Sequence, residues 1–389
     1  MRIVHCIDYF QPKLGYQETF LAKEHIKLGH EVFVVTSDRY NPYVYEGGAA
    51  KKVLGERIKS AGFFNEEGIR VWRLKTLLEL KRKVWPIGLE KKIRELKPDI
   101  VVMHGTVNFF TLRLAGLKKK RKNFKLINDD HMVFYASRSK ARFLYPLFKF
   151  LFSRLLQDAA DAFVGVSQTS KMFMHQRYGI PLERIAVIPL GADDRLFKYD
   201  EVARRDIRKQ LSIGEKDTVF IYAGKMVIEK GPHLLVKAAT ELTKTRGDIK
   251  VMLVGNGLPS YMDEMKQDIG RNGLENKFVW VNAVPNKELY KFYSAADIAV
   301  WPREASLGMI EAMSCGLPII ISDTSEVTER VGHANGLTYK GDDALDLARQ
   351  MEKLLDPELR KKMGEQGKRF VKEDLSWSNI AGQFIELVK

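Results

Sequence analysis

The sequence has few cysteines and no long apolar run. Its 389 residues include two cysteines, Cys6 and Cys315, which lie far apart along the chain. This number excludes a disulfide-stapled scaffold and a cysteine-based metal site, and it favours a reducing compartment. No stretch approaches the roughly 20 consecutive apolar residues of a membrane-spanning helix. The first residues, MRIVHCIDYF, predict a strand rather than a signal peptide. We therefore expect a cytoplasmic globular protein.

Two further patterns are missing. No complete G-x-G-x-x-G follows the first predicted strand, which makes a nicotinamide-dependent dehydrogenase the least expected enzyme class. The sequence also contains no low-complexity tract and no repeat of solenoid length. A chain of 389 residues with 45% hydrophobic and 29% charged residues is instead typical of a soluble protein with two domains.

Positive charge is abundant, and it is unevenly distributed. The formal net charge is +15. Residues 1–192 contain 34 lysines and arginines against 18 acidic residues, whereas residues 193–389 contain 30 against 31. A field of one sign on one half of a protein usually serves an anionic partner, such as a phosphorylated substrate, an acidic membrane or a nucleic acid.

Short, nearly continuous apolar runs alternate with longer amphipathic segments in both halves of the chain. The predicted strands are IVHCIDYF (3–10), VFVVTS (32–37), DIVVMHG (99–105), KLINDD (125–130), AFVGVS (162–167), IAVIPLG (185–191), VFIYAG (219–224), VMLVGNG (251–257), FVWVNA (278–283), DIAVWP (297–302) and PIIISD (318–323). Between them lie helical patterns, such as residues 18–29 with Leu21, His25 and Leu28 at i, i+4 and i+7. This alternation predicts an α/β protein with two doubly wound, Rossmann-like parallel-sheet domains that face each other across a cleft. A boundary is expected near residues 191–197.

Ligands of such folds bind beyond the carboxyl ends of the strands, so the loops there are the candidate sites. In residues 11–20, Gly15 allows backbone N–H groups to approach an anion, although a plain turn is an equal alternative. In residues 223–231, Lys225 and Lys230 lie on either side of a short loop and can straddle a diphosphate, unless both are solvated surface lysines. The loop GNG (255–257) is weak evidence alone.

A fourth loop, residues 303–310, joins the predicted strand 297–302 to a helix that we expect to open at Glu311. The N–H groups of Leu307 and Gly308 would then point towards a phosphate, and Glu311 would accept hydrogen bonds from a ribose diol. The alternative for Glu311 is favourable charge at a helix start, worth about 0.3–1 kcal/mol. Physical arguments from the sequence do not rank the two.

Several stretches occur in an order that is typical of one enzyme family. They are LAKEHIKLGHEVFVVTS (21–37), IPLGADDRLF (188–197), YAGKMVIEKG (222–231), VMLVGNG (251–257), YSAADIAVWP (293–302), EAMSCGLPIIISD (311–323), NGL (335–337) and SWSNIAGQF (376–384). Over essentially its whole length the chain resembles the retaining glycosyltransferases of the GT-B fold, specifically glycosyltransferase family 4. The resemblance implies an acceptor-binding domain at 1–192, a nucleotide-sugar-binding domain at 193–372, and a helix at 373–389 that packs back towards the first domain.

The resemblance also assigns roles to matching residues. The matching positions are Gly15, Lys225, Lys230, Leu307 and Gly308 for the donor diphosphate, Ser306 for a donor-loop contact, and Glu311 for the ribose. Lys225 stands where the family more often has arginine, so it keeps the charge but loses the planar fork. Gly15 has Tyr16 where the family usually has a second glycine.

Two catalytic positions follow from the resemblance. The family separates its two donor-loop glutamates by seven residues, whereas six residues separate Glu304 from Glu311. Without a gap the first position is Arg303; with a loop one residue shorter it is Glu304, which we prefer as the contact to the donor sugar. His131, in LINDDHMVFY, resembles the active-site histidine of the first domain. A structural role for this histidine is an equal alternative.

The implied reaction is transfer of a sugar from a nucleotide-diphospho-sugar, most readily a UDP- or GDP-sugar, to a glycan or polyprenyl-linked acceptor with retention of configuration. No carboxylate nucleophile is evident, so a front-face path is preferred, in which the leaving diphosphate helps to take the acceptor's proton. Lysines and backbone amides stabilise the diphosphate, and we expect no metal ion and no cofactor.

Three basic segments of the first half contain aromatic or apolar residues: 70–85, 118–125 and 141–156. Together these residue types are typical of a helix that lies in a membrane interface. We expect peripheral attachment to an anionic membrane surface, on the inner face of the cell membrane. The alternative is that 141–156 is a buried inter-helix element and that the lysines are solvated.

Two other functions are consistent with parts of the sequence. A nucleotide-sugar epimerase or phosphorylase would share the architecture, and it would isomerise or phosphorolyse a sugar without transfer to an acceptor. A nucleic-acid-binding protein would use the basic half, but these segments lack a recognition motif, so no nucleic-acid partner is expected.

Overall fold

The computed structural model describes residues 1–389 with the exception of 46–48, 81, 122, 135–142, 304–305 and 326–327. The described chain forms two compact units. Unit 1 comprises Met1–Leu190 together with Trp377–Lys389, and unit 2 comprises Gly191–Ser376. The chain therefore passes from one unit to the other after Leu190 and returns after Ser376.

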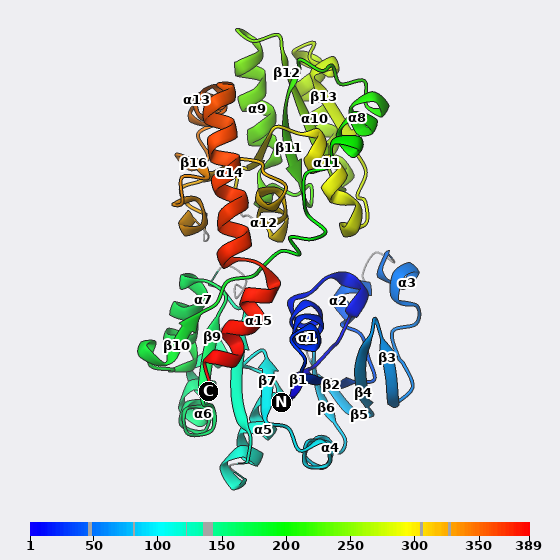
Figure 1. The fold of residues 1–389 in the computed structure, drawn as a ribbon, viewed down its shortest axis with the longest axis vertical. Coiled ribbons are helices and arrows are strands. Elements are labelled where there is room, and N and C mark those ends of the chain that lie inside the picture. The colour runs from blue at the N-terminus through cyan, green and yellow to red at the C-terminus, as the bar shows by residue number, and fades with distance from the viewer. Residues whose placement is uncertain (46–48, 81, 122, 135–142, 304–305, 326–327) are drawn as a thin grey trace. The chain divides into compact units, whose positions relative to one another are not determined.

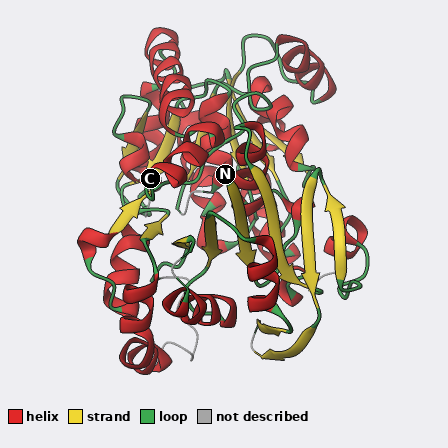
Figure 2. Cartoon of the chain, turned by 60° about the horizontal axis from the view of Figure 1, so that its bottom comes forward, coloured by secondary structure: helices red, strands yellow, loops and turns green. Residues whose placement is uncertain are grey.

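Unit 1 is built on a sheet with the strand order β10-β9-β8-β7-β1-β2-β4-β3. Neighbouring strands are parallel except for the antiparallel pair of β3 and β4 at one edge. The strands are β1 (Arg2–Ile7), β2 (Glu31–Ser37), β3 (Gly62–Glu66), β4 (Ile69–Leu74), β7 (Ile100–His104), β8 (Lys125–Asp130), β9 (Ala162–Gly165) and β10 (Ile185–Val187). The central strands are buried on both faces, which explains their nearly continuous apolar sequences. Figure 2 shows these strands side by side among the helices.

Helices of unit 1 cover this sheet (Figure 1). They are α1 (Gln17–Lys27), α2 (Pro42–Tyr45), α3 (Ala49–Leu54), α4 (Leu89–Leu96), α5 (Phe109–Lys120), α6 (Tyr145–Ala159), α7 (Gln168–Phe173) and α15 (Trp377–Glu386). Short helical turns are η1 (Pro12–Leu14), η3 (Met174–Tyr178) and η4 (Leu182–Arg184). The last helix, α15, packs against α1, and the rings of Phe20 and Trp377 stack with their centroids 5.1 Å apart.

Unit 2 contains a parallel sheet with the order β13-β12-β11-β14-β15-β16. Its strands are β11 (Thr218–Ala223), β12 (Ile249–Val254), β13 (Phe278–Val281), β14 (Ile298–Trp301), β15 (Ile319–Ser322) and β16 (Gly336–Tyr339). Its helices are α8 (Glu201–Gln210), α9 (Pro232–Thr243), α10 (Pro259–Arg271), α11 (Leu289–Ala295), α12 (Leu307–Ser314), α13 (Ala344–Lys353) and α14 (Pro357–Asp374). The turns are η5 (Ile228–Lys230), η6 (Glu275–Lys277), η7 (Asn286–Glu288) and η8 (Thr328–Val331). The predicted α/β class, with parallel sheets in two domains, is confirmed.

Some local expectations were wrong. The described residues of 70–85, a segment that we grouped with interfacial helices, lie in β4 and in the antiparallel hairpin of β5 (Thr76–Leu80) and β6 (Lys83–Pro86). In α1, Leu21 and His25 are buried as expected, but Leu28 is exposed because the helix has already ended at Lys27. No helix in the described part of the chain is both long enough and apolar enough to cross a bilayer.

Candidate functional site

The sheet of unit 2 has its topological switch point between β11 and β14. From β11 the chain proceeds to β12 and β13 on one side, and from β14 it proceeds to β15 and β16 on the other. The loops after the two strands contact each other. Arg303 Nη1 donates a hydrogen bond to the carbonyl of Ile228 at 2.6 Å, and a Cβ on Gly231 would lie 2.9 Å from Cγ of Arg303. In open α/β sheets such a point is the usual ligand position.

Both candidate lysines lie on the loop after β11. Lys225 is exposed, and its carbonyl accepts a hydrogen bond from the Tyr222 hydroxyl at 2.8 Å. Lys230 is half-buried at the end of η5. Gly231 follows in a left-handed conformation, with φ of 71°, and the chain then enters α9. The structure thus places both lysines at the switch point, on a loop whose backbone is fixed at each end.

Arg303 has a structural partner. Its Nε and Nη2 atoms donate to the two carboxylate oxygens of Asp342 at 2.7 and 2.8 Å. Together with the bond to Ile228, this fork holds Arg303 against two neighbouring loops. Arg303 is therefore occupied in joining these loops. The preferred alternative, Glu304, lies outside the described residues.

Helix α12 begins at Leu307, so the N–H groups of Leu307 and Gly308 are the first two of the helix and have no acceptor within it. Ser306 is the N-cap residue with an extended backbone, but its side chain makes no capping hydrogen bond. A Cβ on Gly308 would lie 2.8 Å from the Tyr293 hydroxyl oxygen. The first turn of α12 therefore needs a residue without a side chain at this position.

Glu311 lies in the second turn of α12, not at its start, and is 6% exposed. The alternative role as a charge at the helix start is therefore wrong. Burial raises the pKa of Glu311 to about 7, and the hydrogen bond from Asn286 Nδ2, at 2.8 Å, acts in the opposite direction. A buried carboxyl group with one such partner retains acceptor capacity for a ligand's hydroxyl groups.

The glycines of the loop GNG (255–257) are explained by close packing of the backbone. A Cβ on Gly255 would lie 1.9 Å from the carbonyl oxygen of Gly224, and one on Gly257 would lie 1.8 Å from that of Met226. The Met226 N–H also donates to the Asn256 carbonyl at 3.0 Å. The two glycines therefore allow the loop after β12 to pack backbone to backbone against the loop that carries Lys225.

In unit 1, Gly15 ends the turn η1 in a left-handed conformation with φ of 70°. Tyr16 then precedes the first turn of α1, which already contains the buried carboxyl group of Glu18. Burial raises the pKa of Glu18, and the charges of His104 and His131 oppose this rise. The turn at Gly15 is as expected, but the first turn of α1 beside it already contains an acidic side chain, that of Glu18.

His131 directly follows β8, and its Nε2 lies 3.3 Å from Oδ1 of Asp129. The side chain of His131 is 42% exposed, whereas that of Asp129 is fully buried. Desolvation lowers the pKa of His131, but the charges of Asp129 and Asp130 outweigh it and raise the pKa above its ordinary value. The imidazole of His131 is thus partly exposed to solvent and lies next to the buried carboxylate of Asp129.

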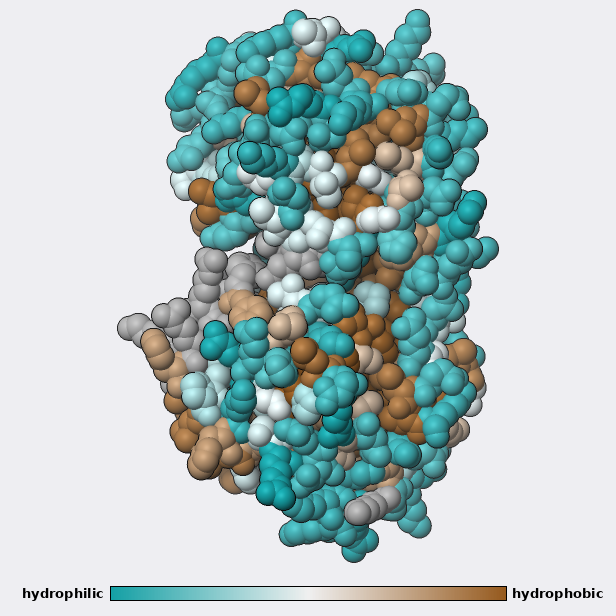
Figure 3. All heavy atoms as spheres, turned by 90° about the vertical axis from the view of Figure 1, so that its left-hand side faces the viewer, coloured by the Kyte–Doolittle hydropathy of each residue, from teal (hydrophilic) through white to brown (hydrophobic). Residues whose placement is uncertain are grey.

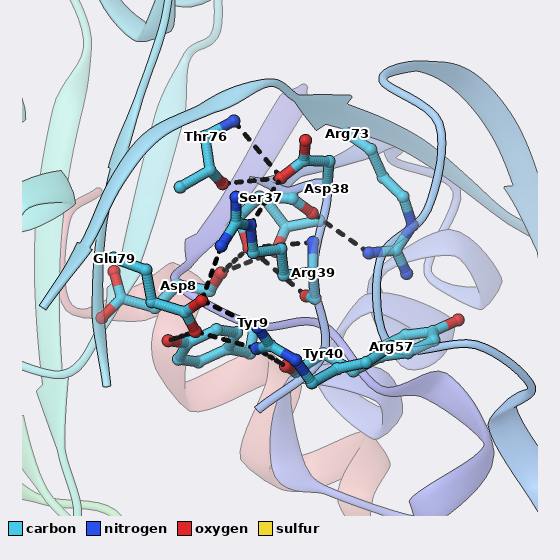
Figure 4. A network of polar contacts seen from close by, with 11 residues as sticks. Asp8, Tyr9, Ser37, Asp38, Arg39, Tyr40, Arg57, Arg73, Thr76 and Glu79 are labelled. Atoms are coloured by element: carbon cyan, nitrogen blue, oxygen red, sulfur yellow. Dashed lines mark hydrogen bonds and ion pairs between the residues drawn. The ribbon is translucent and has the colours of Figure 1, made fainter. Parts of the chain in front are cut away.

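Sequence reasoning missed a polar network beyond the carboxyl ends of β1 and β2 (Figure 4). Glu79 accepts hydrogen bonds from Tyr9, Arg39 and Arg57 at 2.7–2.9 Å. The Arg57 fork is the largest influence that lowers the pKa of Glu79 to about 2. Asp8 is 7% exposed, burial raises its pKa to about 7, and its Oδ1 has no partner among the described residues. The available signal was an acidic residue directly after an apolar strand.

No group of three or more histidine, cysteine or acidic side chains in the described ranges is arranged to hold a metal ion.

Two sequence models match the chain in succession. Residues 19–196 match glycosyltransferase family 4, and residues 203–370 match glycosyl transferases group 1. A lipopolysaccharide 1,2-N-acetylglucosaminetransferase of Salmonella typhimurium is 22% identical over 317 residues, which are 78% of this chain and 76% of that protein. A GDP-mannose-dependent alpha-(1-6)-phosphatidylinositol monomannoside mannosyltransferase of Mycobacterium tuberculosis is 25% identical over 61% of this chain, and the match spans 63% of the relative's length.

The fold is also similar to solved structures. Alr3699/HepE of Anabaena, in complex with UDP, superposes with a TM-score of 0.76 over 99% of each chain, at 18% sequence identity. At this identity the likeness concerns the fold, which is GT-B. The matches to both halves, in the order expected from the motifs, show that the chain belongs to the group 1 (family 4) glycosyltransferases.

Proposed function

We propose that the protein is a retaining glycosyltransferase that moves a sugar from a nucleotide-diphospho-sugar to a glycan or lipid-linked acceptor at the cytoplasmic face of the membrane. The single observation that carries the donor part is the switch point of unit 2. There the lysine loop contacts the loop before α12, and a buried carboxyl group, Glu311, lies one turn into that helix.

The donor fits this site by charge and hydrogen-bonding chemistry. Lys225 and Lys230 supply positive charge, and the first N–H groups of α12 supply donors, so a diphosphate is matched on two sides. Glu311 suits the paired hydroxyls of a ribose. UDP in HepE and the GDP-mannose dependence of the mycobacterial relative support these two nucleotides as the first to test.

Thermal-shift measurements with UDP-, GDP- and ADP-sugars test the donor. One nucleotide should raise the melting temperature more than the others at equal concentration, because binding to the folded state stabilises it by mass action. Equal shifts with all three, or none, would contradict a dedicated nucleotide-sugar site.

In the proposed front-face reaction, the leaving diphosphate accepts the proton of the acceptor hydroxyl as the new glycosidic bond forms on the same face. The lysines and the Leu307 and Gly308 amides stabilise its growing charge. The variant Lys225→Ala/Lys230→Ala should lose several kcal/mol of transition-state stabilisation, since one such donor is worth about 3 kcal/mol. The matched control is Lys244→Ala/Lys266→Ala, which removes two surface lysines of unit 2 that pair with neighbouring acids on their own helices. Parental turnover of the first variant contradicts the assignment.

We also propose that the transfer needs no divalent ion, because the lysines and amides provide the charge compensation. Activity should survive exhaustive treatment with EDTA, and the addition of Mg²⁺ or Mn²⁺ should leave kcat unchanged. Loss of activity on chelation, with recovery on adding the metal back, would show a required ion.

Membrane attachment is supported by α6. Apolar side chains are exposed along one helix and the turn before it, at spacings of three and four residues. They are Phe143 (72% exposed), Leu144 (55%), Leu147 (54%), Phe150 (85%) and Leu151 (53%). Figure 3 shows apolar side chains at the surface on this side of the molecule. Lys149 and Arg154 are exposed on the same helix. An apolar stripe with basic residues suits an anionic lipid surface.

Co-sedimentation with vesicles tests this attachment. The protein should pellet with anionic vesicles at moderate salt and remain in the supernatant with neutral ones. Leu147→Glu/Phe150→Glu should abolish pelleting, whereas the control Val202→Glu/Leu345→Glu should not, because those residues are similarly exposed (58% and 57%) on unit 2. If the α6 variant pellets as the wild type does, the exposed apolar side chains of α6 are not the membrane-binding surface.

A further inference from the structure

Three buried histidines of unit 1 form a continuous chain of hydrogen bonds that ends at Asp129. His25 Nε2 lies 3.0 Å from the carbonyl oxygen of Ala381 on α15. His25 Nδ1 lies 3.1 Å from His5 Nε2, and His5 Nδ1 lies 3.0 Å from His104 Nε2. His104 Nδ1 lies 2.7 Å from Oδ2 of Asp129. We call this series, from His25 to Asp129, the histidine chain.

The fold brings these residues together from elements that are distant in sequence. His25 lies on α1, His5 on β1, His104 at the end of β7 and Asp129 on β8. Strands β1, β7 and β8 are neighbours in the sheet, and His104 is the register partner of Asp129. The rings of His5 and His104 are nearly coplanar, with their planes 8° apart and their centroids 5.3 Å apart, as a hydrogen bond in the ring plane requires. Each of the four side chains is at most 7% exposed, so water does not complete the contacts.

The number of hydrogens in the histidine chain follows from its two ends. The Ala381 carbonyl at one end can only accept, and an ionised Asp129 carboxylate at the other end can only accept. The four contacts between them each need one hydrogen, but three neutral imidazoles supply only three. The histidine chain must therefore hold one additional proton.

The position of this proton follows from the same geometry. The Ala381 carbonyl requires a hydrogen on His25 Nε2, so a neutral His25 accepts at Nδ1 from His5. A neutral His5 then accepts at Nδ1 from His104 Nε2. His104 must donate there and also to Asp129, so it carries a hydrogen on both nitrogens. Its positive charge then lies next to the one carboxylate of the chain.

The charged surroundings agree with this arrangement. Burial lowers the pKa of His25 to about 4 and that of His5 well below its ordinary value, which disfavours a charge on either ring. Burial alone would raise the pKa of Asp129, but the charge of His131 and the hydrogen bond from His104 lower it well below its usual range. The other titratable groups that interact with these residues are Glu18 on α1, His30 after α1 and Asp130 at the end of β8.

We propose that His104 is a buried imidazolium whose charge is imposed by the histidine chain, and that it positions His131 through their shared partner Asp129. One oxygen of Asp129 faces His104 and the other faces His131. A permanent cation on the buried side orients the carboxylate and offsets part of its charge. His131 is thereby held beside a carboxylate whose charge is partly offset. The consequence for sugar transfer rests on the function proposed above, whereas the charge of His104 does not.

The direct test is ¹⁵N NMR of the imidazole rings in the full-length wild-type protein. At pH 7.5, His104 should show two protonated nitrogens, while His5 and His25 should each show a hydrogen on Nε2 and a bare Nδ1. A bare nitrogen on His104, including the case in which Asp129 holds the proton, overturns the proposal.

The positioning role is tested with His104→Gln, which keeps a hydrogen-bond donor towards Asp129 but removes the charge. The pKa of His131, followed by NMR on its exposed ring, should rise by about one unit, because a neighbouring cation has been removed. The pH at which kcat/KM changes should move with it. The control His30→Gln removes a ring 6.3 Å from that of His25 that makes no hydrogen bond of the chain.

The outcomes separate the two levels of the proposal. If His131 titrates identically in His104→Gln and in the wild type, the positioning role is wrong. If its pKa moves while the pH profile of transfer stays fixed, His104 positions His131 as stated, but the proposed involvement of His131 in transfer fails. If His104→Gln does not fold, the ring spectra of the wild type still decide the charge of His104.

Discussion

At the scale of single residues, Glu311 combines burial with the ribose-binding role proposed above, and together these predict a pH dependence. Its pKa of about 7 in the folded protein lies above the ordinary value for glutamic acid. Hydrogen bonds to a charged acceptor are worth about 1.5–3 kcal/mol. Nucleotide affinity should therefore increase roughly tenfold as the pH rises from 6 to 8, as isothermal titration calorimetry can measure. Glu311→Gln should bind weakly and show no such rise.

The same residue makes a stability prediction. A carboxyl group with a raised pKa contributes stability below its ordinary pKa, and this contribution is lost as the pH rises through about 7. Glu311→Gln should consequently melt a few degrees above the wild type at pH 8, with the difference disappearing near pH 5. A constant difference across this range would show that the Glu311 carboxyl group does not titrate as stated.

The sequence indicated some of these residues and not others. Glu311 and Lys230 were found because each belongs to a local motif at the end of a predicted strand. His5 and His104 lie within or at the end of apolar runs and have no local signature. His25 even fitted the apolar period of α1. Their relationship depends on which strands become neighbours, and that information is not contained in any one segment.

At the scale of secondary structure, replacing a glycine by alanine should have opposite effects on stability in two helices. A Cβ on Gly364 in α14 would lie 2.1 Å from the carbonyl oxygen of Gly316, which is backbone and cannot rotate away. Gly364→Ala should therefore destabilise unit 2 by about 2 kcal/mol or more, measured by chemical denaturation. The matched control is Gly116→Ala in α5, where nothing lies within 4 Å. It should be neutral or stabilising by up to about 1 kcal/mol.

Most of the buried parallel strands were predictable because they are nearly continuous apolar runs; the predicted strand 219–224, for example, nearly coincides with β11 (Thr218–Ala223). The strands of region 62–86 were not predictable, since they are partly exposed and their exposed positions hold both polar and apolar residues, which gives no regular pattern. Strand β16, Gly336–Tyr339, was also missed, because its sequence GLTY is not an apolar run and only its last residue is buried. The start of α12 was placed four residues late, since we expected it at Glu311 and the helix begins at Leu307.

At the scale of the whole molecule, the discontinuous composition of unit 1 can be tested by truncation. Helix α15 contributes buried Trp377, Ile380 and Phe384 to unit 1, and the Ala381 carbonyl to the histidine chain. A protein ending at Ser376 should lose hydrogen-exchange protection in α1 and β1, while peptides from β11 and β12 keep theirs. Equal loss in both units would contradict the assignment of α15 to unit 1.

The passage of the chain out of unit 1 and back also bears on biosynthesis. As the polypeptide leaves the ribosome, every residue of unit 2 emerges before α15 does. Unit 2 can complete its sheet while unit 1 still exposes the surface of α1 that α15 will cover, including the edge of His25. Nascent unit 1 is therefore the part that a chaperone would have to shield, and its histidine chain is complete only after Ala381 has been translated and docked.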